Sequence, residues 1–165
     1  MYRVSRFLIY GIGLVLLLSL VACGTQPVPD YGMNEPVTGE EWEVTVLSAE
    51  NMGSEFERGG STIRTESANT NLLFVRIELE SVTGASVETS YLGNVEVRDN
   101  RGDTYHWWLA GMAPAVYYDA EAQTGNPIYV LDSSVQTEYI FKVPDDATTF
   151  DLLWQDLPAI RLTVE

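Results

Sequence analysis

Hydrophobic and polar residues alternate along most of the chain after residue 41, with the period of two that is typical of β-strands. The clearest case is the run 73–79, in which every second residue is Leu, Val or Ile. Similar runs lie at 42–46, 95–98, 105–107, 139–143, 150–154 and 160–164. No segment in this part of the chain keeps a helical period over about 11 residues. Seven short strands therefore predict an all-β sandwich or barrel.

The segments between these runs also predict local structure. The pentapeptide from Asp99 to Asp103, Asp-Asn-Arg-Gly-Asp, lies between two of the runs and predicts a β-hairpin. Residues 51–71 are mostly polar and include three glycines, so we expect a long, mobile loop there. The stretch 109–123 has Ala-rich patches, and it has room for one short helix or 3₁₀ turn.

The N-terminal region has a different pattern. Two positive charges, Arg3 and Arg6, precede an apolar run from Phe7 to Ala22, and the only cysteine, Cys23, follows it. A positive start, an apolar run and a small residue before the break are the parts of a secretory signal. The apolar run has 16 residues, which is fewer than the roughly 20 that a helix needs to span a bilayer.

Residues 20–23, Leu-Val-Ala-Cys, resemble the lipobox of bacterial lipoproteins. The resemblance implies that a diacylglycerol is joined to the thiol of Cys23, that the chain is cut before it, and that Cys23 becomes the new N-terminus. Two alternatives are an uncleaved short anchor and a signal cut near Ala22 that leaves a free thiol. The lipoprotein interpretation accounts for the lone cysteine, and it predicts an extracytoplasmic protein held at the cell membrane by its lipid.

These features divide the chain into three predicted parts. Residues 1–22 form the lipoprotein signal peptide. Residues 23–41 comprise the lipidated Cys23 and a flexible linker, because this segment is rich in Pro and Gly and has no hydrophobic period. Residues 42–165 form the β-sandwich domain.

Four segments of the domain also carry a family resemblance. They are Trp-Glu-Val at 42–44, the strong strand 73–79, Asp-x-x-Gly-x-x-Tyr at 99–105, and the segment 139–144, which ends in Val-Pro. Together they resemble the immunoglobulin-like, telokin-like domain of bacterial lipoproteins. The resemblance implies an immunoglobulin-like antiparallel β-sandwich. That family has no agreed catalytic residues, so the resemblance implies none in this chain.

Composition and charge narrow the possible functions. The chain of 165 residues has 24 Asp and Glu against 9 Lys and Arg, and removal of the signal with its two arginines leaves a net charge of −17. Nucleic acid is excluded as a partner, because phosphate binding needs clustered Lys and Arg. A single Cys and a single His exclude an internal disulfide and a Cys/His zinc site within one chain. We predict no cofactor and no metal.

The densest aromatic cluster supplies the candidate binding residues, namely Trp107, Trp108, Tyr117 and Tyr118. Neighbouring residues on a strand point to opposite faces, so we expect one tryptophan in the core and the other partly exposed. An exposed Trp beside Tyr can stack on a sugar ring or pack against a partner protein. Alternatively, the stretch 109–123 covers both tryptophans. The resulting prediction is a binding or assembly module for an envelope protein or glycan, and not an enzyme.

Three alternatives remain open at this point. A small hydrolase would need His106 and two acids to converge. Calcium could bind acidic turns, at Asp99, Asn100 and Asp103 or at 145–146, although these residue types are also common turn formers and the EF-hand spacing is absent. The third alternative is a purely structural envelope lipoprotein.

Overall fold

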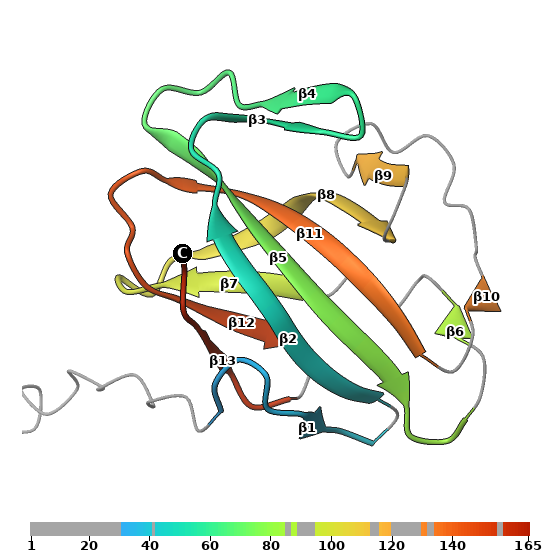
Figure 1. Cartoon of the computed structure of the whole chain (residues 1–165). Coiled ribbons are helices and arrows are strands. Elements are labelled where there is room, and N and C mark those ends of the chain that lie inside the picture. The colour runs from blue at the N-terminus through green and yellow to red at the C-terminus, as the bar shows by residue number, and fades with distance from the viewer. Residues whose placement is uncertain are drawn as a thin grey trace, which may run out of the picture.

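The structure is a computed structural model, and it describes residues 31–40, 42–84, 87–88, 95–112, 116–119, 130–131, 134–154 and 157–165. The regular secondary structure of these residues consists of β-strands (Figure 1). Within these ranges, no helix has the length and apolar character needed to cross a membrane. The signal, Cys23 and the first part of the predicted linker lie outside the described residues.

Seven principal strands correspond to the seven alternating runs of the sequence. They are β2 (Trp42–Asn51), β5 (Thr70–Ser81), β7 (Val95–Asp99), β8 (Thr104–Met112), β11 (Ser134–Pro144), β12 (Phe150–Trp154) and β13 (Ile160–Leu162). The shorter strands are β1 (Val37–Thr38), β3 (Glu55–Arg58), β4 (Ser61–Arg64), β6 (Val87–Glu88), β9 (Val116–Asp119) and β10 (Val130–Leu131).

The strand order is that of an immunoglobulin-like sandwich. The large sheet runs β2-β5-β11-β8, the small sheet runs β7-β12-β13, and the strands pair antiparallel. Lettered A to G along the chain, the principal strands give A-B-E-D and C-F-G, the two sheets of the immunoglobulin fold. Strand β8 also pairs with β7 near its start, so the two sheets join there (Figure 1). The predicted fold class is confirmed.

The core fills the space between the two sheets. Buried and half-buried residues alternate along β7 and along the first half of β2, as the sequence pattern predicts. At the centre, the buried ring of Tyr139 lies 6.4 Å from Trp107, 6.2 Å from Phe141 and 6.5 Å from Trp154, measured between ring centroids. Full burial of one such large apolar side chain stabilises a fold by about 1.5–3 kcal/mol.

Residues 31–38 form an N-terminal strap that joins the edges of the two sheets. Tyr31 forms a bridge with Ile160 of β13, while Val37 and Thr38 pair with β2. Val37 is 2% exposed and belongs to the core. The predicted flexible linker 23–41 is therefore wrong over residues 31–40. The short strand β1 fixes this segment because its pairing satisfies backbone groups at the free edge of β2.

The rest of the β2 edge is also occupied. The amide of Asn34 donates to the carbonyl of Val46 at 2.9 Å. Farther along, Glu165 exchanges hydrogen bonds of 3.1 Å with Ala49 and Asn51. The edge of β13 is partly covered too, since the amide of Arg161 donates to the carbonyl of Tyr31 at 2.9 Å.

One expectation about the connections is wrong. Residues 51–71 contain the hairpin β3–β4, which closes with a two-residue turn at Gly59 and Gly60. Their φ angles of 58° and 80° suit the type I′ turn that the twist of a hairpin favours. In 109–123, the described residues continue β8 to Met112 and form β9. A short helix or 3₁₀ turn in this stretch stays a prediction for residues 113–115 and 120–123, which lie outside the described residues. The hairpin from β7 to β8 at residues 99–104 is confirmed.

Candidate functional site

A β-bulge in β8 places Leu109 on the same face of the sheet as Trp108. Ile140 of β11 pairs with Leu109, whereas the next residue, Phe141, pairs with Trp107, so Trp108 is an extra residue in β8. Trp107 packs against the core. Trp108 and Leu109 both pack on the opposite, outer face of the large sheet. A bulge aims side chains in this way because it interrupts the alternation of the strand.

A second, smaller apolar cluster lies on that outer face. Its buried residues are Ile63, Leu72, Phe74 and Ile140, with Met52, Phe56, Trp108 and Leu109 packed against them. We call this set the outer cluster. Phe56 and Ile63 come from the β3–β4 hairpin, and the rings of Phe56 and Phe74 meet edge to face at 6.3 Å. The hairpin is therefore packed against the sheet, at the end opposite the strap (Figure 1).

Cations lie over the aromatic rings of the outer cluster. The Lys142 Nζ is 3.9 Å from the centre of the Trp108 ring, and the Arg58 and Arg76 guanidinium carbons are 4.7 and 5.8 Å from the Phe74 ring. Such contacts contribute about 0.5–2 kcal/mol each, more where water is excluded. We call Trp108, Lys142, Arg58 and Arg76 the Trp108 surface.

One buried carboxylate organises the two arginines. The side chain of Glu138 is 3% exposed, and its Oε1 accepts from Arg58 and also from Arg76 at 3.0 and 3.2 Å. Arg76 lies directly opposite Glu138 across the β5–β11 ladder, whereas Arg58 comes from β3. The ion pairs thus fasten the hairpin to the sheet. The side chains of Arg58 and Arg76 remain about one-third exposed, at 31% and 36%.

The structure brings the backbone of the two candidate tyrosines beside the bulged strand. β9 pairs with β8, with Tyr117 opposite Gly111 and Tyr118 opposite Ala110. The side chains of Tyr117 and Tyr118 lie outside the described residues. Their contribution to binding stays a prediction.

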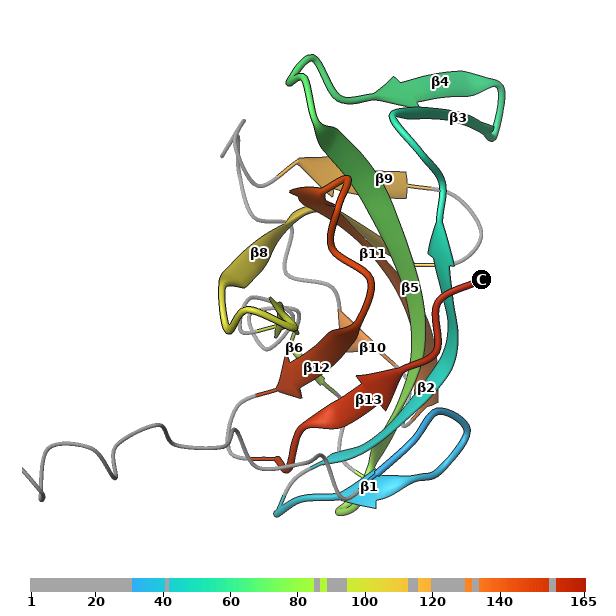
Figure 2. The same ribbon diagram turned by 90° about the vertical axis from the view of Figure 1, so that its left-hand side faces the viewer.

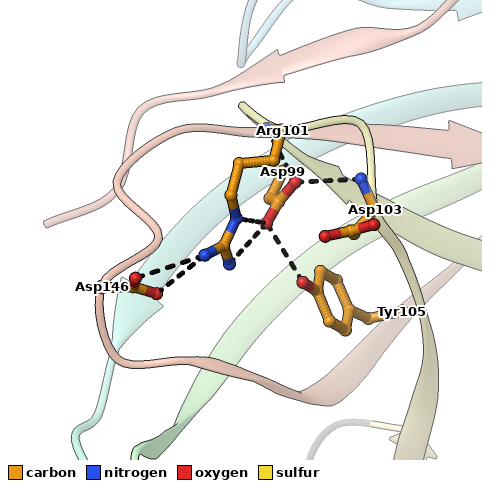
Figure 3. Close-up of polar contacts among 5 residues, drawn as sticks. All are labelled: Asp99, Arg101, Asp103, Tyr105 and Asp146. Carbon is orange, nitrogen blue, oxygen red and sulfur yellow. Dashed lines mark hydrogen bonds and ion pairs between the residues drawn. The ribbon is translucent and has the colours of Figure 1, made fainter.

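The Asp-x-x-Gly-x-x-Tyr segment forms a polar network at the β7–β8 turn (Figure 3). The buried Asp99 Oδ1 accepts from the amides of Arg101 and Asp103, at 2.9 and 3.0 Å. Its Oδ2 accepts from the Arg101 guanidinium at 2.9 and 3.0 Å, and from the Tyr105 hydroxyl at 3.1 Å. Arg101 also reaches both Asp146 oxygens at 3.2 Å, which ties this turn to the β11–β12 turn.

The donors of this network keep Asp99 ionised. Burial alone would raise the pKa of the carboxyl, but the bonds from the Arg101 amide and guanidinium, the Tyr105 hydroxyl and the Asp103 amide outweigh burial and lower the pKa below its ordinary 3.8. Burial and the donated bond to Asp99 raise the pKa of Tyr105. Both oxygens of Asp99 accept hydrogen bonds from residues 101–105, so the carboxylate stabilises the β7–β8 turn.

In the described parts of the chain, no three His, Cys, Asp or Glu side chains gather where they could hold a metal ion. His106 is 76% exposed, and its Nδ1 lies 3.2 Å from Glu96 on the outer face of the small sheet. That pair stands on an open strand surface, and no second acid joins it among the described residues. The geometry gives the hydrolase alternative no support.

The sequence pattern missed two buried ion-pair groups. In one, Glu138 is held by Arg58 and Arg76. In the other, Asp151, with 7% of its side chain exposed, is held by Arg98 at 3.1 Å and Arg161 at 2.6 Å across β7, β12 and β13. Charged residues of opposite sign at outward positions of neighbouring strands were the available signal, but the strand register was needed to pair them.

Comparisons with known proteins support the fold. No protein-family model matches the chain, and neither does any curated protein. Solved structures similar to it include an uncharacterized beta-sandwich protein from Clostridium difficile (TM-score 0.55, 12% identity, 84% of this chain and 97% of that one). The yjhA protein from Bacillus subtilis (0.51, 13%, 81% and 99%) and a conserved hypothetical protein from Bacillus anthracis (0.52, 12%, 84% and 100%) are also similar. At such identities, the likeness shows a shared β-sandwich fold alone.

Proposed function

We propose that this chain is a lipid-anchored extracytoplasmic lipoprotein whose β-sandwich binds an envelope protein or glycan through the Trp108 surface. The bulge in β8 carries the proposal, because it leaves Leu109 beside Trp108 on the outer face of the sheet. A regular strand would return Leu109 to the core side and leave Trp108 alone on the outer face. The bulge instead places two large apolar side chains there.

The chemistry of the Trp108 surface supports binding. Trp and Arg are the residues that most often dominate the energy of protein interfaces, since they combine large contact area with polar groups. Here Trp108 lies beside Lys142, with Arg58 and Arg76 about one-third exposed nearby. Indole rings also stack on the apolar faces of sugars. A module of this kind needs no catalytic residues.

The anchor belongs to the same proposal and rests on the sequence. The lipobox-like residues 20–23 predict a lipid on Cys23. Two or three acyl chains would hold the protein stably at the membrane, because each buried CH₂ contributes about 0.8 kcal/mol and one chain alone is marginal.

Replacing Trp108 tests the binding function. We expect Trp108→Ala to reduce retention of the partner from envelope extracts by at least about tenfold, the effect of losing a central aromatic anchor. Retention is measured by pull-down with the immobilised domain, followed by mass spectrometry. His106→Ala is the matched control, since it also removes an aromatic ring but from the other sheet, and its retained proteins should equal those of wild type. Unchanged retention by a folded Trp108→Ala domain would contradict the proposal.

The anchor has a separate test. In the wild-type protein, the N-terminal peptide recovered from membranes should begin at Cys23 and carry a diacylglyceryl thioether, as measured by mass spectrometry. Cys23→Ala should abolish incorporation of labelled fatty acid, because the acceptor thiol is gone. An intact N-terminus with residues 1–22 and a free Cys23 thiol would show that the chain is anchored by another route.

A further inference from the structure

The strap and the Trp108 surface lie at opposite ends of the large sheet. β1 of the strap pairs with Glu43 and Val44, at the start of β2. The row that contains the outer cluster crosses β2 at Glu50, near its end, through the pairs Glu50–Phe74, Phe74–Ile140 and Ile140–Leu109. Six residues of strand separate Val44 from Glu50, a distance of about 20 Å. The β3–β4 hairpin lies beyond that row (Figures 1 and 2).

The folded strap leaves little chain between the domain and the proposed lipid. Residues 24–30 are the seven residues between Cys23 and Tyr31. Fully extended, they allow at most about 28 Å between the Cα atoms of Cys23 and Tyr31. A flexible chain of this length averages about 15 Å. A domain of this size is about 36 Å across, so the tether is shorter than the body it holds.

Charge adds to this restraint. The exported part of the chain carries a net charge of −17, and an anionic lipid surface repels such a body. Lying flat would bring the side of the sandwich towards the headgroups, which the charge opposes. Standing on the strap brings only one end of this acidic body close to the lipid.

We propose that the domain stands on the bilayer with its strap end towards the lipid, so that the Trp108 surface and the hairpin point away from it. This orientation rests on the lipid anchor of the proposed function. The partner of the Trp108 surface is then an envelope component that approaches from the aqueous side, and not a lipid.

Energy transfer from labelled positions to the membrane tests this orientation. Cys23 is the only cysteine, and its lipid occupies the thiol, so a single introduced cysteine can be labelled uniquely. One donor is placed by Val82→Cys, at a 50% exposed residue just after the strap end of β5. The other is placed by Glu57→Cys, at an exposed residue of the hairpin. The lipidated protein is inserted in phosphatidylcholine vesicles that carry an acceptor on the headgroups.

We expect at least about twofold stronger transfer from position 82 than from position 57, since the length of β2 separates the two ends by about 33 Å. Inserting twenty Gly-Ser residues after Thr25 should lower the transfer from position 82 and reduce the difference, which shows that the short tether sets the orientation. Equal transfer from both positions, or stronger transfer from position 57, would overturn the orientation and indicate that the Trp108 surface contacts lipid. If the protein recovered from cells carries no lipid and does not float with the vesicles, the proposed anchor is wrong, and the orientation that rests on it is wrong too.

Discussion

A chain that begins at Trp42, where the alternating pattern starts, should be about 4 kcal/mol less stable than a chain that begins at Tyr31. Removing the strap uncovers the core around Val37, whose burial contributes about 1.5–3 kcal/mol, and it removes backbone hydrogen bonds at the edges of β2 and β13 that contribute about 0.5–1.5 kcal/mol each. The free energy of unfolding is measured by urea denaturation of the two signal-free chains.

Point variants separate the strap's packing from chain length. In the chain from Tyr31, Val37→Asp should destabilise by about 3 kcal/mol or more, because it buries a charge without a partner. Thr38→Ala is the control, since Thr38 is exposed and its hydroxyl donates a solvent-exposed hydrogen bond of 2.8 Å to the half-buried Glu43. Its effect should stay within about 0.5 kcal/mol. Equal stability of the Trp42 and Tyr31 chains would mean that the strap is not part of the folded unit.

Asp99→Asn should lower the free energy of unfolding by about 2–3 kcal/mol at neutral pH. The Asp99 carboxylate accepts hydrogen bonds on both oxygens, and bonds to a charged group contribute about 1.5–3 kcal/mol. An Asn amide presents N–H groups to one set of these donors, so those bonds are lost. The neighbouring variant Asp103→Asn is the control, because Asp103 enters the network through its backbone amide.

The loss of stability caused by Asp99→Asn should become smaller as the pH falls. The pKa of Asp99 is lower in the folded protein than its ordinary 3.8, so its ionised form stabilises the fold above about pH 4, the unfolded value. This stabilisation is lost as the pH falls through the folded pKa. The stability difference between wild type and Asp99→Asn should therefore narrow below about pH 4 in urea titrations. A difference that stays constant down to pH 2 would show that the Asp99 charge is not the source.

The alternation of apolar and polar residues was enough to predict the principal strands, because every second residue of a half-buried strand faces the core and is apolar. The run 73–79 and the turn at 99–103 appear in the structure as β5 and the β7–β8 hairpin. The strap escaped prediction because its strand has two residues, too few to show a period. The β3–β4 hairpin escaped because Phe56 and Ile63 are its only large apolar residues, although Gly59-Gly60 was a usable turn signal.

The candidate site was predicted in part. That Trp107 and Trp108 point to opposite faces follows from their adjacency alone. The bulge leaves no trace in the sequence, because Trp108 and Leu109 are both apolar and either could face the core. The residues that form and support the Trp108 surface come from distant segments of the chain. Arg58 and Glu138, for example, lie 80 residues apart. The register of β5 and β11 places Arg76 opposite Glu138, and the packing of the β3–β4 hairpin on the sheet adds Arg58.

The covered edges of β2 and β13 have a consequence for a protein concentrated at a membrane. Confinement of many copies to a thin layer multiplies their encounters, and an exposed strand would offer each neighbour a template for edge-to-edge β-pairing and eventual aggregation. The strap and Glu165 already occupy backbone groups along β2, and Tyr31 does so at β13. With the proposed lipid anchor, densely arrayed copies of the domain would therefore remain separate monomers on that side of the sandwich.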